Sequence, residues 1–471
     1  MTAAEESGVT RQVAGGASDD SLLDPDGRLR ALADDCVHCG FCLPACPTYQ
    51  LWGEEMDSPR GRIHLIAQIL DGGHGGEAAA EHFDRCLGCM ACVTACPSGV
   101  QYGQLIEAAR SWSEPASGTG IRAPAVLPPR SARDRIARAA IFATFPYPAR
   151  LRAALGPLRA AQRTGLDKVV AHSKLLARIA PEAAAALSVA PRQRTHTGWR
   201  RPARRRPVLP IRIAARGERR AVVGMLTGCV QQVLFPQVNA ATARVLAKEG
   251  CDVIVPPSQG CCGALSLHGG RQAEAAAFAR RTIETFEQAG VDAIIVNAAG
   301  CGSAMKEYEQ LLRDDPEWAR RAAAFGARVR DFTEFLADLG PVAPRAELRM
   351  TVAYHDACHL AHAQRITAQP RSLLRGIPGV SLAEIPDAGT CCGSAGIYNL
   401  VQPAAAAELG ARKAVSVRAT GADLVVSGNP GCSLQLAQAL AAAGQPLPVA
   451  HIAEVIDASI MGRPPATLLG G

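Results

Sequence analysis

Aromatic residues are scarce in this chain, and long uninterrupted apolar runs are missing from it. Phe, Trp and Tyr make up 4% of the 471 residues, whereas hydrophobic residues as a whole make up 48%. The cores must therefore be built mainly from Ala, Val, Leu and Ile, although the overall composition is that of a globular protein. No stretch approaches the ~18 consecutive apolar residues of a membrane-spanning helix, so we expect none.

Two kinds of motif are also missing. Residues 1–35 hold several acidic side chains but no apolar run that resembles a signal peptide, which favours a reducing, cytoplasmic compartment.

No GxGxxG pattern follows a predicted strand, so we expect no flavin or nicotinamide on this chain. We find neither a catalytic triad nor a paired-carboxylate site, and we therefore expect no catalytic side chains. Any substrate chemistry is predicted to take place on the cofactor of a partner protein.

Cysteine, by contrast, is abundant, and eight of the seventeen cysteines repeat one pattern. The pattern is C-x2-C-x2-C-x3-C-P, the spacing of bacterial two-cluster ferredoxins. In such runs three cysteines bind one cluster and the fourth binds the other cluster. We therefore predict two [4Fe–4S] clusters. Cluster 1 is assigned to Cys36, Cys39, Cys42 and Cys96, and cluster 2 to Cys86, Cys89, Cys92 and Cys46.

Zinc and disulfides are the competing explanations for these eight cysteines. Zinc sites usually pair CxxC motifs that are a dozen or more residues apart, whereas each run here packs four cysteines into eleven residues. Disulfides are typical of exported chains, which this sequence does not resemble. Cluster binding is therefore favoured over both alternatives.

Two arginines follow the first motif closely. Arg60 and Arg62 fall in a stretch, 59–70, whose apolar residues recur at helical spacing. Positive charge beside an iron–sulfur cluster can raise its reduction potential. The alternative is that these arginines form ion pairs with Glu54 or Glu55.

The C-terminal half of the chain is internally duplicated. A Cys, a Cys-Cys-Gly triplet and a further Cys occur twice, and equivalent cysteines are 129, 130 and 131 residues apart. A period of this length indicates a duplicated domain. Short apolar runs alternate with helical stretches in both copies, which predicts parallel sheets. The apolar runs include 221–226, 253–255, 293–296, 352–354 and 424–426, and the helical stretches include 239–248, 273–288 and 404–418. The first set is Cys229, Cys261, Cys262 and Cys301, and the second is Cys358, Cys391, Cys392 and Cys432.

These two sets are candidate metal ligands. In each repeat the first and last cysteines directly follow a predicted strand, at the edge where open parallel sheets bind ligands. Gly263 and Gly393 permit a turn that would bring adjacent thiols to one side. We predict one additional iron–sulfur cluster or a zinc ion in one or both repeats; a redox-active cysteine set and a relic site are the alternatives.

Histidines cluster around the second set. His355, His359 and His362 surround Cys358, and His268 follows the first triplet. Imidazole can bind metal or relay protons. For these histidines we favour ordinary polar contacts near a helix N-terminus.

Together the patterns predict an α/β protein with a small ferredoxin-like α+β module at the N-terminal side. The predicted segments are the two-cluster module at 24–110, a helical, Pro- and Arg-rich connector at 111–220, and the repeats at 221–345 and 346–471. Within the connector we predict helices at 132–145 and 174–179. Cys251 is left over and is interpreted as a buried hydrophobe.

Residues 191–220 hold eleven arginines and four prolines against one acid. We interpret them as an extended charged linker and expect no nucleic-acid partner, since no nucleic-acid-binding signature accompanies them.

These motifs resemble one known family over nearly the whole chain, the iron–sulfur subunit of bacterial glycolate oxidase (glycolate dehydrogenase). The cluster motifs alone are widely shared, and the combination with tandem cysteine-rich repeats is far more specific. The matching runs are 36–42, 46–51, 59–62, 239–246, 260–264, 300–302 and 391–396.

The resemblance implies a subunit of an enzyme complex. Its FAD-containing partner would oxidise glycolate to glyoxylate, and this chain would pass the electrons to a quinone or similar acceptor. The implied location is cytoplasmic, or peripheral on the inner face of the cell membrane. Lactate, glycerol-3-phosphate and heterodisulfide oxidoreductases carry similar modules and are the alternatives. Heterodisulfide reductase repeats typically end in CxxC, whereas 301–304 and 432–435 lack the second cysteine, which disfavours that cluster chemistry here.

Overall fold

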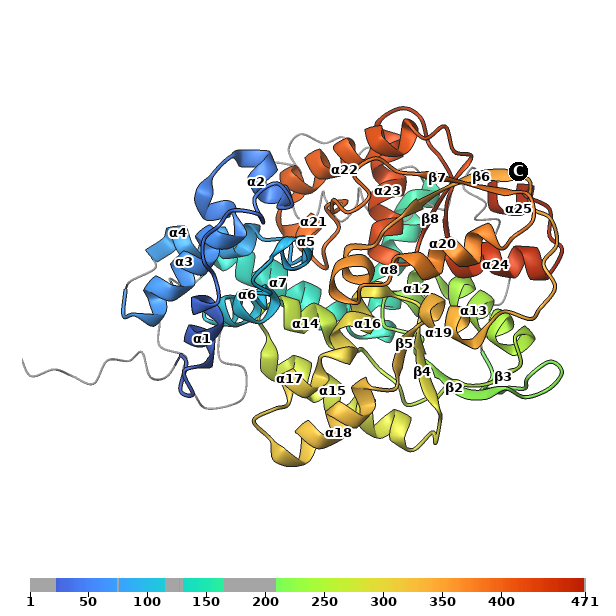
Figure 1. The fold of residues 1–471 in the computed structure, drawn as a ribbon, viewed down its shortest axis with the longest axis horizontal. Helices are drawn as coiled ribbons and strands as arrows, with labels where there is room; N and C mark the ends of the chain where they lie inside the picture. The colour runs from blue at the N-terminus through green and yellow to red at the C-terminus, as the bar shows by residue number, and fades with distance from the viewer. Residues whose placement is uncertain (1–22, 74–75, 115–126, 128–129, 165–208, 470–471) are drawn as a thin grey trace, which may run out of the picture.

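The computed structural model describes residues 23–73, 76–114, 127, 130–164 and 209–469. The helix predicted at 174–179 and the Arg-rich residues 191–208 lie outside these ranges. Figure 1 shows the N-terminal module in blue beside the second repeat in orange to red, with the first repeat in green to yellow below them. Among the described residues, no helix combines the length and apolar character needed to cross a membrane.

The N-terminal module is helical in its described part. Its helices are α1 (Arg28–Asp34), α2 (Pro47–Trp52), η2 (Glu55–Asp57), α3 (Pro59–Leu70), α4 (Gly76–Arg85), α5 (Ala91–Ala95) and α6 (Tyr102–Ser111).

The helix predicted at 59–70 is confirmed as α3, which begins with a proline and is capped by Ser58, whose Oγ accepts from Gly61 N at 3.0 Å. No strand occurs in the described residues of 23–114, so the expected α+β module is corrected to a helical one. One reason is local: Cys46 is followed by Pro47 at the first position of α2, so the chain leaves the first motif as a helix.

Two parallel sheets form the repeats, as predicted. The first has the order β1-β3-β2-β4-β5 and the second β7-β6-β8-β9. Every pairing is parallel except that of β1 with β3. The strands are β1 (Arg212–Ile213), β2 (Ala221–Met225), β3 (Cys251–Ile254), β4 (Ala293–Val296), β5 (Val329–Asp331), β6 (Met350–His355), β7 (Val380–Glu384), β8 (Leu424–Ser427) and β9 (Val449–His451).

The order β3-β2-β4-β5 matches the order β7-β6-β8-β9, so the duplication seen in the cysteine spacing is also a duplication of topology. The central strands β4 and β8 consist almost entirely of buried aliphatic residues, as expected for strands covered on both faces. Strand β1 comes from the predicted connector and adds an antiparallel edge to the first sheet.

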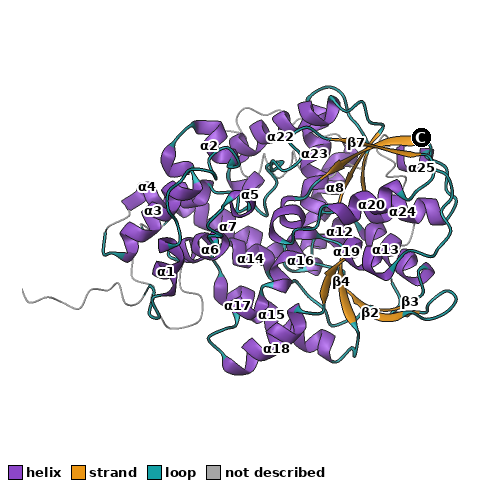
Figure 2. Cartoon of the chain, in the orientation of Figure 1, coloured by secondary structure: helices purple, strands orange, loops and turns teal. Residues whose placement is uncertain are grey.

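Helices cover the sheets on both sides (Figure 2). The predicted helices at 132–145, 239–248, 273–288 and 404–418 correspond to α7, α13, α15 and α22 within a few residues at their ends. The connector helices are α7 (Ala132–Thr144) and α8 (Pro148–Thr164). The helices of the first repeat are α12 (Gln231–Leu234), α13 (Pro236–Lys248), α14 (Ala264–His268), α15 (Gln272–Glu287), α16 (Ala299–Lys306), α17 (Tyr308–Leu311), α18 (Pro316–Gly326) and α19 (Phe332–Leu339). Those of the second are η3 (His359–Ala363), α20 (Ala368–Arg375), α21 (Tyr398–Val401), α22 (Pro403–Arg418), α23 (Pro430–Ala442), α24 (Ile452–Ile460) and α25 (Ala466–Leu469).

The two repeats share one hydrophobic core. Helices α13, α19, α20 and α24 lie between the sheets, and their buried side chains join those of β2, β6 and β8 in a single cluster. Arg244 on α13 reaches across to Asp457 on α24, with Nη2 to Oδ2 at 2.7 Å. His451 Nε2 donates to Asn297 O at 2.9 Å, at the ends of β9 and β4. These contacts fix the carboxyl ends of the two sheets relative to each other.

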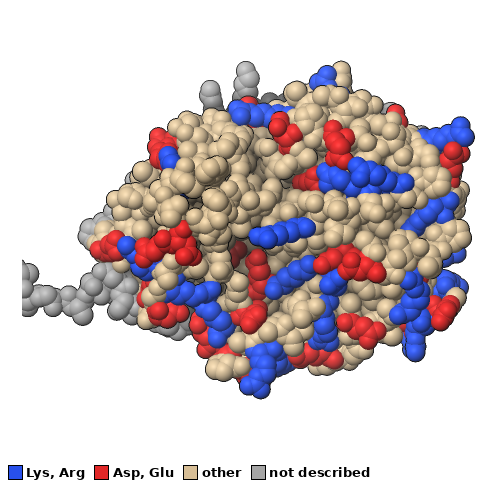
Figure 3. Space-filling view, in the orientation of Figure 1, with Lys and Arg blue, Asp and Glu red and all other residues tan. Residues whose placement is uncertain are grey.

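The N-terminal module contacts both repeats. His359 Nε2 lies 3.0 Å from Gly88 O, in the loop of the second cysteine motif. Arg110 Nη1 on α6 donates to His268 O at 2.8 Å. Both cysteine motifs and both cysteine-rich repeats are therefore parts of one packed unit. On the face shown in Figure 3, basic and acidic side chains are interspersed over the repeats, so this surface carries charges of both signs.

Candidate metal centres and the cavity beside them

The loops of the two ferredoxin-type motifs have the same backbone conformation. His38 and Gly40 in the first motif have φ of 53° and 85°, and Gly88 and Met90 at the equivalent positions have φ of 63° and 62°. Left-handed conformations are uncommon for residues other than glycine. Their occurrence at matching positions of both loops indicates that each loop is held in a shape that curls its cysteines toward one point.

Each loop surrounds a small cavity, and in each case the fourth cysteine comes from the other motif. The last cysteines, Cys46 and Cys96, are extended (ψ of 114° and 116°), as expected before a proline. The cavity of the first motif is lined by Cys36, Cys39, Cys42, Cys92 and Cys96, and that of the second by Cys46, Cys86, Cys89 and Cys92. Each cavity thus includes the four cysteines that the spacing assigns to one cluster, and Cys92 lines both cavities.

The electrostatics of the second set suit a bound cation. Burial raises the pKa of the thiols of Cys89 and Cys92, and neighbouring cysteine sulfurs raise it further. Burial opposes ionisation of Cys86 too, but the charges of Arg62 and Arg110 outweigh it and lower the pKa of that thiol. Several buried thiolates repel one another unless a metal neutralises them, so the residues present fit a cationic metal group.

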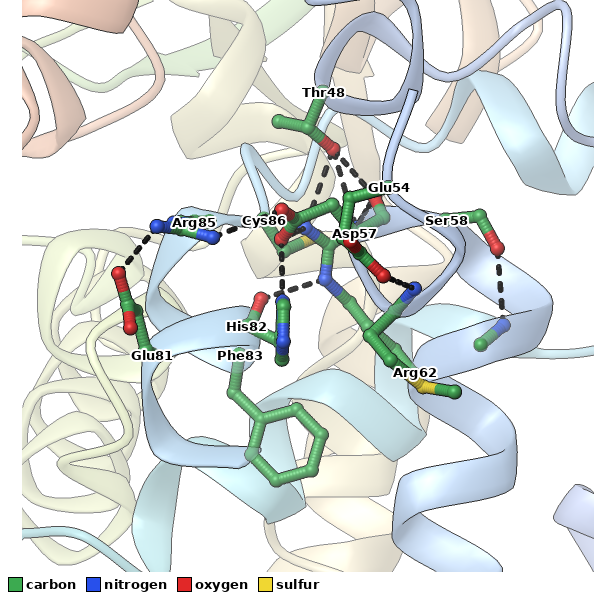
Figure 4. Close-up of polar contacts among 12 residues, drawn as sticks. Thr48, Glu54, Asp57, Ser58, Arg62, Glu81, His82, Phe83, Arg85 and Cys86 are labelled. Atoms are coloured by element: carbon green, nitrogen blue, oxygen red, sulfur yellow. Dashed lines mark hydrogen bonds and ion pairs between the residues drawn. The ribbon is translucent and has the colours of Figure 1, made fainter. Parts of the chain in front are cut away.

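A buried arginine lies beside the second set (Figure 4). The Arg62 side chain is 1% exposed, and its Nη2 lies 3.2 Å from Oδ1 of the fully buried Asp57. His82 Nδ1 and Arg85 Nη1 complete the shell of that carboxylate at 2.9 and 3.1 Å. Thr48 links this network to the metal site, because its Oγ1 donates to Asp57 O at 2.8 Å and lies 3.2 Å from Cys46 Sγ.

The two arginines near the first motif therefore have different roles. Arg60 pairs with Glu55, Nε to Oε1 at 2.6 Å, which is the ion pair considered as the alternative. Arg62 instead pairs with Asp57 and places its charge near Cys46 and Cys86, which belong to the second set rather than the first.

The four thiols of each repeat also converge. In the first repeat the sulfur of Cys261 contacts those of Cys229 and Cys262, and Cys262 contacts Cys301. In the second, contacts run in the same order through Cys358, Cys391, Cys392 and Cys432.

The turns after the adjacent cysteines require glycine. Gly263 and Gly393 have φ of 84° and 87°, and a Cβ at Gly393 would lie 2.7 Å from Ala406 O. The turns that were expected to bring adjacent thiols together are therefore present in both repeats.

The histidines around Cys358 behave differently from one another. His362 contacts Thr94 Oγ1 at 3.0 Å and Gly389 O at 2.9 Å, and His359 contacts Gly88 O, so ordinary polar contacts describe these two. His355 is 1% exposed, and neither of its ring nitrogens has a hydrogen-bond partner among the described residues. Burial and, to a smaller extent, the charge of Lys413 together lower the pKa of His355 to about 3. The expectation of ordinary contacts is therefore wrong for His355.

A larger cavity of about 510 Å³ lies where the three modules meet. Cys86 and Leu87 border it on one side, cysteines of both repeats line it, and apolar residues of α8 and α12, such as Leu155 and Leu234, cover another side. Four buried polar atoms of its lining residues lack a partner among the described residues: His268 Nε2, His359 Nδ1, Gln231 Oε1 and Tyr398 Oη. Sequence reasoning missed Gln231 and Tyr398, since no local motif marks them.

Comparison with known proteins agrees with this geometry. Residues 32–100 match the model of a 4Fe-4S dicluster domain, and residues 223–306 and 352–437 each match that of a cysteine-rich domain. Residues 133–189 match the linker region of the glycolate oxidase iron-sulfur subunit. The chain is thus defined as an iron–sulfur electron-transfer subunit with tandem cysteine-rich domains.

Similar curated proteins identify the family. A probable glycolate oxidase iron-sulfur subunit of Bacillus subtilis is 37% identical over 85% of this chain and 88% of its own. The glycolate oxidase iron-sulfur subunit of Escherichia coli is 36% identical over 88% of this chain and 92% of its own. Lactate utilization protein A of Shouchella clausii is 31% identical over 50% of this chain and 98% of its own. The chain belongs to the family of glycolate oxidase iron–sulfur subunits.

The buried ion-pair network generates a stability prediction. Changing Arg62→Met removes the fully buried one of the two arginines that pair with buried Asp57, which should lower the free energy of unfolding by about 3–5 kcal/mol. Arg412→Met is the matched control, because Arg412 pairs with Glu408 on an exposed helix face and should contribute at most about 1 kcal/mol. Urea denaturation of both variants without oxygen measures the difference. If both variants lower the free energy of unfolding by the same amount, the buried network does not stabilise the fold more than an exposed ion pair does.

Proposed function

We propose that this chain carries electrons within a glycolate-oxidising complex. They would come from an FAD-containing partner that oxidises glycolate to glyoxylate and would pass to a quinone or similar acceptor. The observation that carries this proposal is the pair of cysteine-lined cavities in the N-terminal module, each completed by the fourth cysteine of the other motif. Two [4Fe–4S] clusters held there would supply one-electron carriers, which a two-electron flavin needs to reach a distant acceptor.

The residues are proposed to act as follows. Cys36, Cys39, Cys42 and Cys96 hold cluster 1, and Cys86, Cys89, Cys92 and Cys46 hold cluster 2. Arg62 and Arg110 bring positive charge to Cys86 in a site that solvent hardly reaches, so they favour the more negative, reduced state of cluster 2. The Cys36–Cys42 loop is the more exposed of the two, since Cys39 is exposed whereas Cys86, Cys89 and Cys92 are buried.

The exposed loop is the proposed docking point for the flavoprotein. Val37 and Phe41, on either side of Cys39, are 68% and 67% exposed, which is unusual for large apolar side chains so close together. Exposed apolar groups beside a redox site suit burial against a partner protein. Electrons would therefore enter at the first motif and leave from the second.

The cavity of about 510 Å³ is the proposed binding site of the acceptor. Its volume and largely apolar lining suit a small lipophilic molecule, and the loop of the second motif borders it. The unpartnered His268 Nε2 and Tyr398 Oη can donate hydrogen bonds to carbonyl oxygens of a quinone. Reduction of a quinone to a quinol takes two electrons and two protons. His268 Nδ1 lies 2.8 Å from Glu107 Oε1, and this carboxylate raises the pKa of the imidazole against the effect of burial, so a protonated His268 could donate one of the two protons from Nε2.

The cysteines of the two repeats are proposed as a second group of metal-binding sites, for an iron–sulfur cluster or zinc. A location on the cytoplasmic side, with peripheral contact to the inner face of the cell membrane, would bring the cavity near membrane quinones. Oxidation of lactate is the second candidate function, because half of the chain also resembles lactate utilization proteins.

The substrate is tested on the native complex. The chain, tagged and isolated from its own cells, should retain a flavoprotein and reduce a dye with glycolate. We expect kcat/KM for glycolate to exceed that for lactate, which adds one methyl group, by about tenfold or more. Equal or higher activity with lactate would support the second candidate instead. Isolation without any flavoprotein would contradict the proposal.

The crossed ligation is tested by four cysteine variants. Cys96→Ser should alter the electron paramagnetic resonance spectrum of the reduced, anaerobically purified chain in the same way as Cys39→Ser, because both remove a ligand of cluster 1. Cys89→Ser should instead alter the signal of cluster 2, because it removes a ligand of that cluster. Cys251→Ser is the control and should leave both signals, since Cys251 lies in β3 of the first repeat. A Cys96→Ser spectrum that matches Cys89→Ser would refute the assignment.

The acceptor site is tested by filling the cavity. Leu234→Trp adds a bulky ring to the lining, and overpacking of about 1–3 kcal/mol should slow reduction of a short-chain quinone about tenfold or more. Reduction of a hydrophilic one-electron dye by the same complex should change little, which controls for loss of clusters. If both acceptors slow equally, the cavity is not the quinone site.

A further inference from the structure

The second cysteine-rich repeat contains a ligand group that the first lacks. His355 ends β6, is 1% exposed, and has both ring nitrogens free of hydrogen-bond partners among the described residues. A buried imidazole without partners loses its hydrogen bonds to water and gains nothing in return, which destabilises the fold. Such a group in a native fold indicates a binding partner that the polypeptide itself does not supply.

The neighbours of His355 are two cysteine sulfurs. One ring nitrogen of His355 and the Sγ atoms of Cys392 and Cys432 all lie within 4.8 Å of one another. Zinc binds nitrogen at about 2.0–2.1 Å and sulfur at about 2.3 Å, so two ligand atoms of a tetrahedral ion are roughly 3.5–3.8 Å apart. The three atoms, all within 4.8 Å of one another, can therefore bind a single ion after shifts of at most about 1 Å.

The ligand atoms of the cysteine sets proposed to hold clusters do not lie as close together as these three atoms. Among the described residues, this is the one group of three His, Cys or acidic ligand atoms that meets the 4.8 Å limit. The cysteines around the two N-terminal cavities are more widely spaced than that. The second repeat thus differs in geometry from a site for a four-iron cluster.

The two repeats also differ in sequence at this point. His355 lies three residues before Cys358, and the position three residues before Cys229 is Leu226, a buried aliphatic residue. Ala406 and Ala275 contact the equivalent glycines Gly393 and Gly263 and are 131 residues apart. By the same offset, buried Lys413 replaces Thr282 of the first repeat. Two positions near the thiols thus changed together in the second repeat.

The charges balance for a divalent ion. Two thiolates and a neutral imidazole leave a zinc site without net charge, which suits ligands that are all at most 3% exposed. The sulfur of Cys391 contacts that of Cys392 but is not one of the three ligand atoms that lie within 4.8 Å of one another. Lys413, whose Nζ donates to Asp387 O at 2.6 Å, brings a positive charge close to Cys391 and Cys392.

We propose that the second cysteine-rich repeat binds one zinc ion through Cys392 Sγ, Cys432 Sγ and a ring nitrogen of His355. This inference deepens the proposed metal-binding role of the repeats and rests on it. Zinc has no redox chemistry, so the ion would fix the second repeat beside the cavity without carrying electrons. The all-cysteine set of the first repeat would then be the remaining candidate for an additional cluster.

The test uses the full chain, purified without oxygen and supplied with zinc sulfate. Elemental analysis should find about one zinc per chain, and X-ray absorption at the zinc edge should show both sulfur and nitrogen ligands at the usual distances. His355→Ala should weaken zinc binding by more than about 100-fold, the upper end of what loss of an outer-shell group costs, with unchanged iron. His355→Cys should retain zinc with sulfur in place of the nitrogen.

A matched control is His451→Ala. His451 is equally buried at the end of β9, but its Nε2 contacts Asn297 O at 2.9 Å and its Nδ1 accepts from Ala453 N at 3.1 Å. This variant should lose stability and keep zinc.

Three outcomes would overturn the inference in distinguishable ways. Zinc with a nitrogen ligand that survives His355→Ala would exclude His355. Loss of iron rather than zinc in Cys392→Ser and Cys432→Ser would show a cluster in this repeat, and the broader metal-binding role would stand. No loss of either metal in these variants would overturn the metal-binding role of the second repeat as well.

Discussion

The structure depends on bringing many thiols together in places that water hardly reaches. A thiolate in such a place is unstable unless opposite charge lies beside it, and several thiolates together repel one another. Left-handed turns at His38, Gly88, Gly263 and Gly393 bend the chain so that cysteine sulfurs approach each other. Arg62, Arg110 and Lys413 place positive charge next to them. A bound metal would supply the rest of the neutralisation, because it replaces the protons of thiols whose pKa burial raises.

The arrangement of the modules follows from the same need. Two sheets with identical strand order turn their carboxyl ends toward a common cavity, and the second ferredoxin-type loop closes it from the third side. Duplication supplied two equal frameworks, but Leu226 against His355 and Thr282 against Lys413 show that the two sites have diverged in the ligands and charges that they offer. This arrangement would suit an electron carrier, because the exposed loop can meet one partner while the buried loop borders the cavity that we propose as the acceptor site.

Cysteine spacing predicts two ligand sets for the ferredoxin-type cysteines, because ligands of one cluster must occur at short fixed intervals, and the four cysteines of each set line one cavity. Apolar runs such as Ala293–Val296 predicted the central strands, and periodic stretches such as Pro59–Leu70 predicted helices within a residue or two. The edge strands β5, β7 and β9 escaped prediction, since they are short or only partly buried and carry no continuous apolar signal. Two features could not be predicted: the lack of hydrogen-bond partners at His355 and the cavity beside Tyr398. Both depend on how distant segments pack in the folded chain, and no local sequence pattern encodes that packing. The α+β expectation for the N-terminal module came from analogy with ferredoxins, whereas this chain uses helices there.

The central claim is that the N-terminal module holds two separate four-iron clusters. The most direct measurement is a reductive titration of the full chain, purified without oxygen, with iron analysis and electron paramagnetic resonance on the same sample. The account predicts at least about eight irons per chain and two magnetically interacting clusters that reduce in separate one-electron steps. An iron-free chain that still supports full turnover in the assembled complex would contradict it.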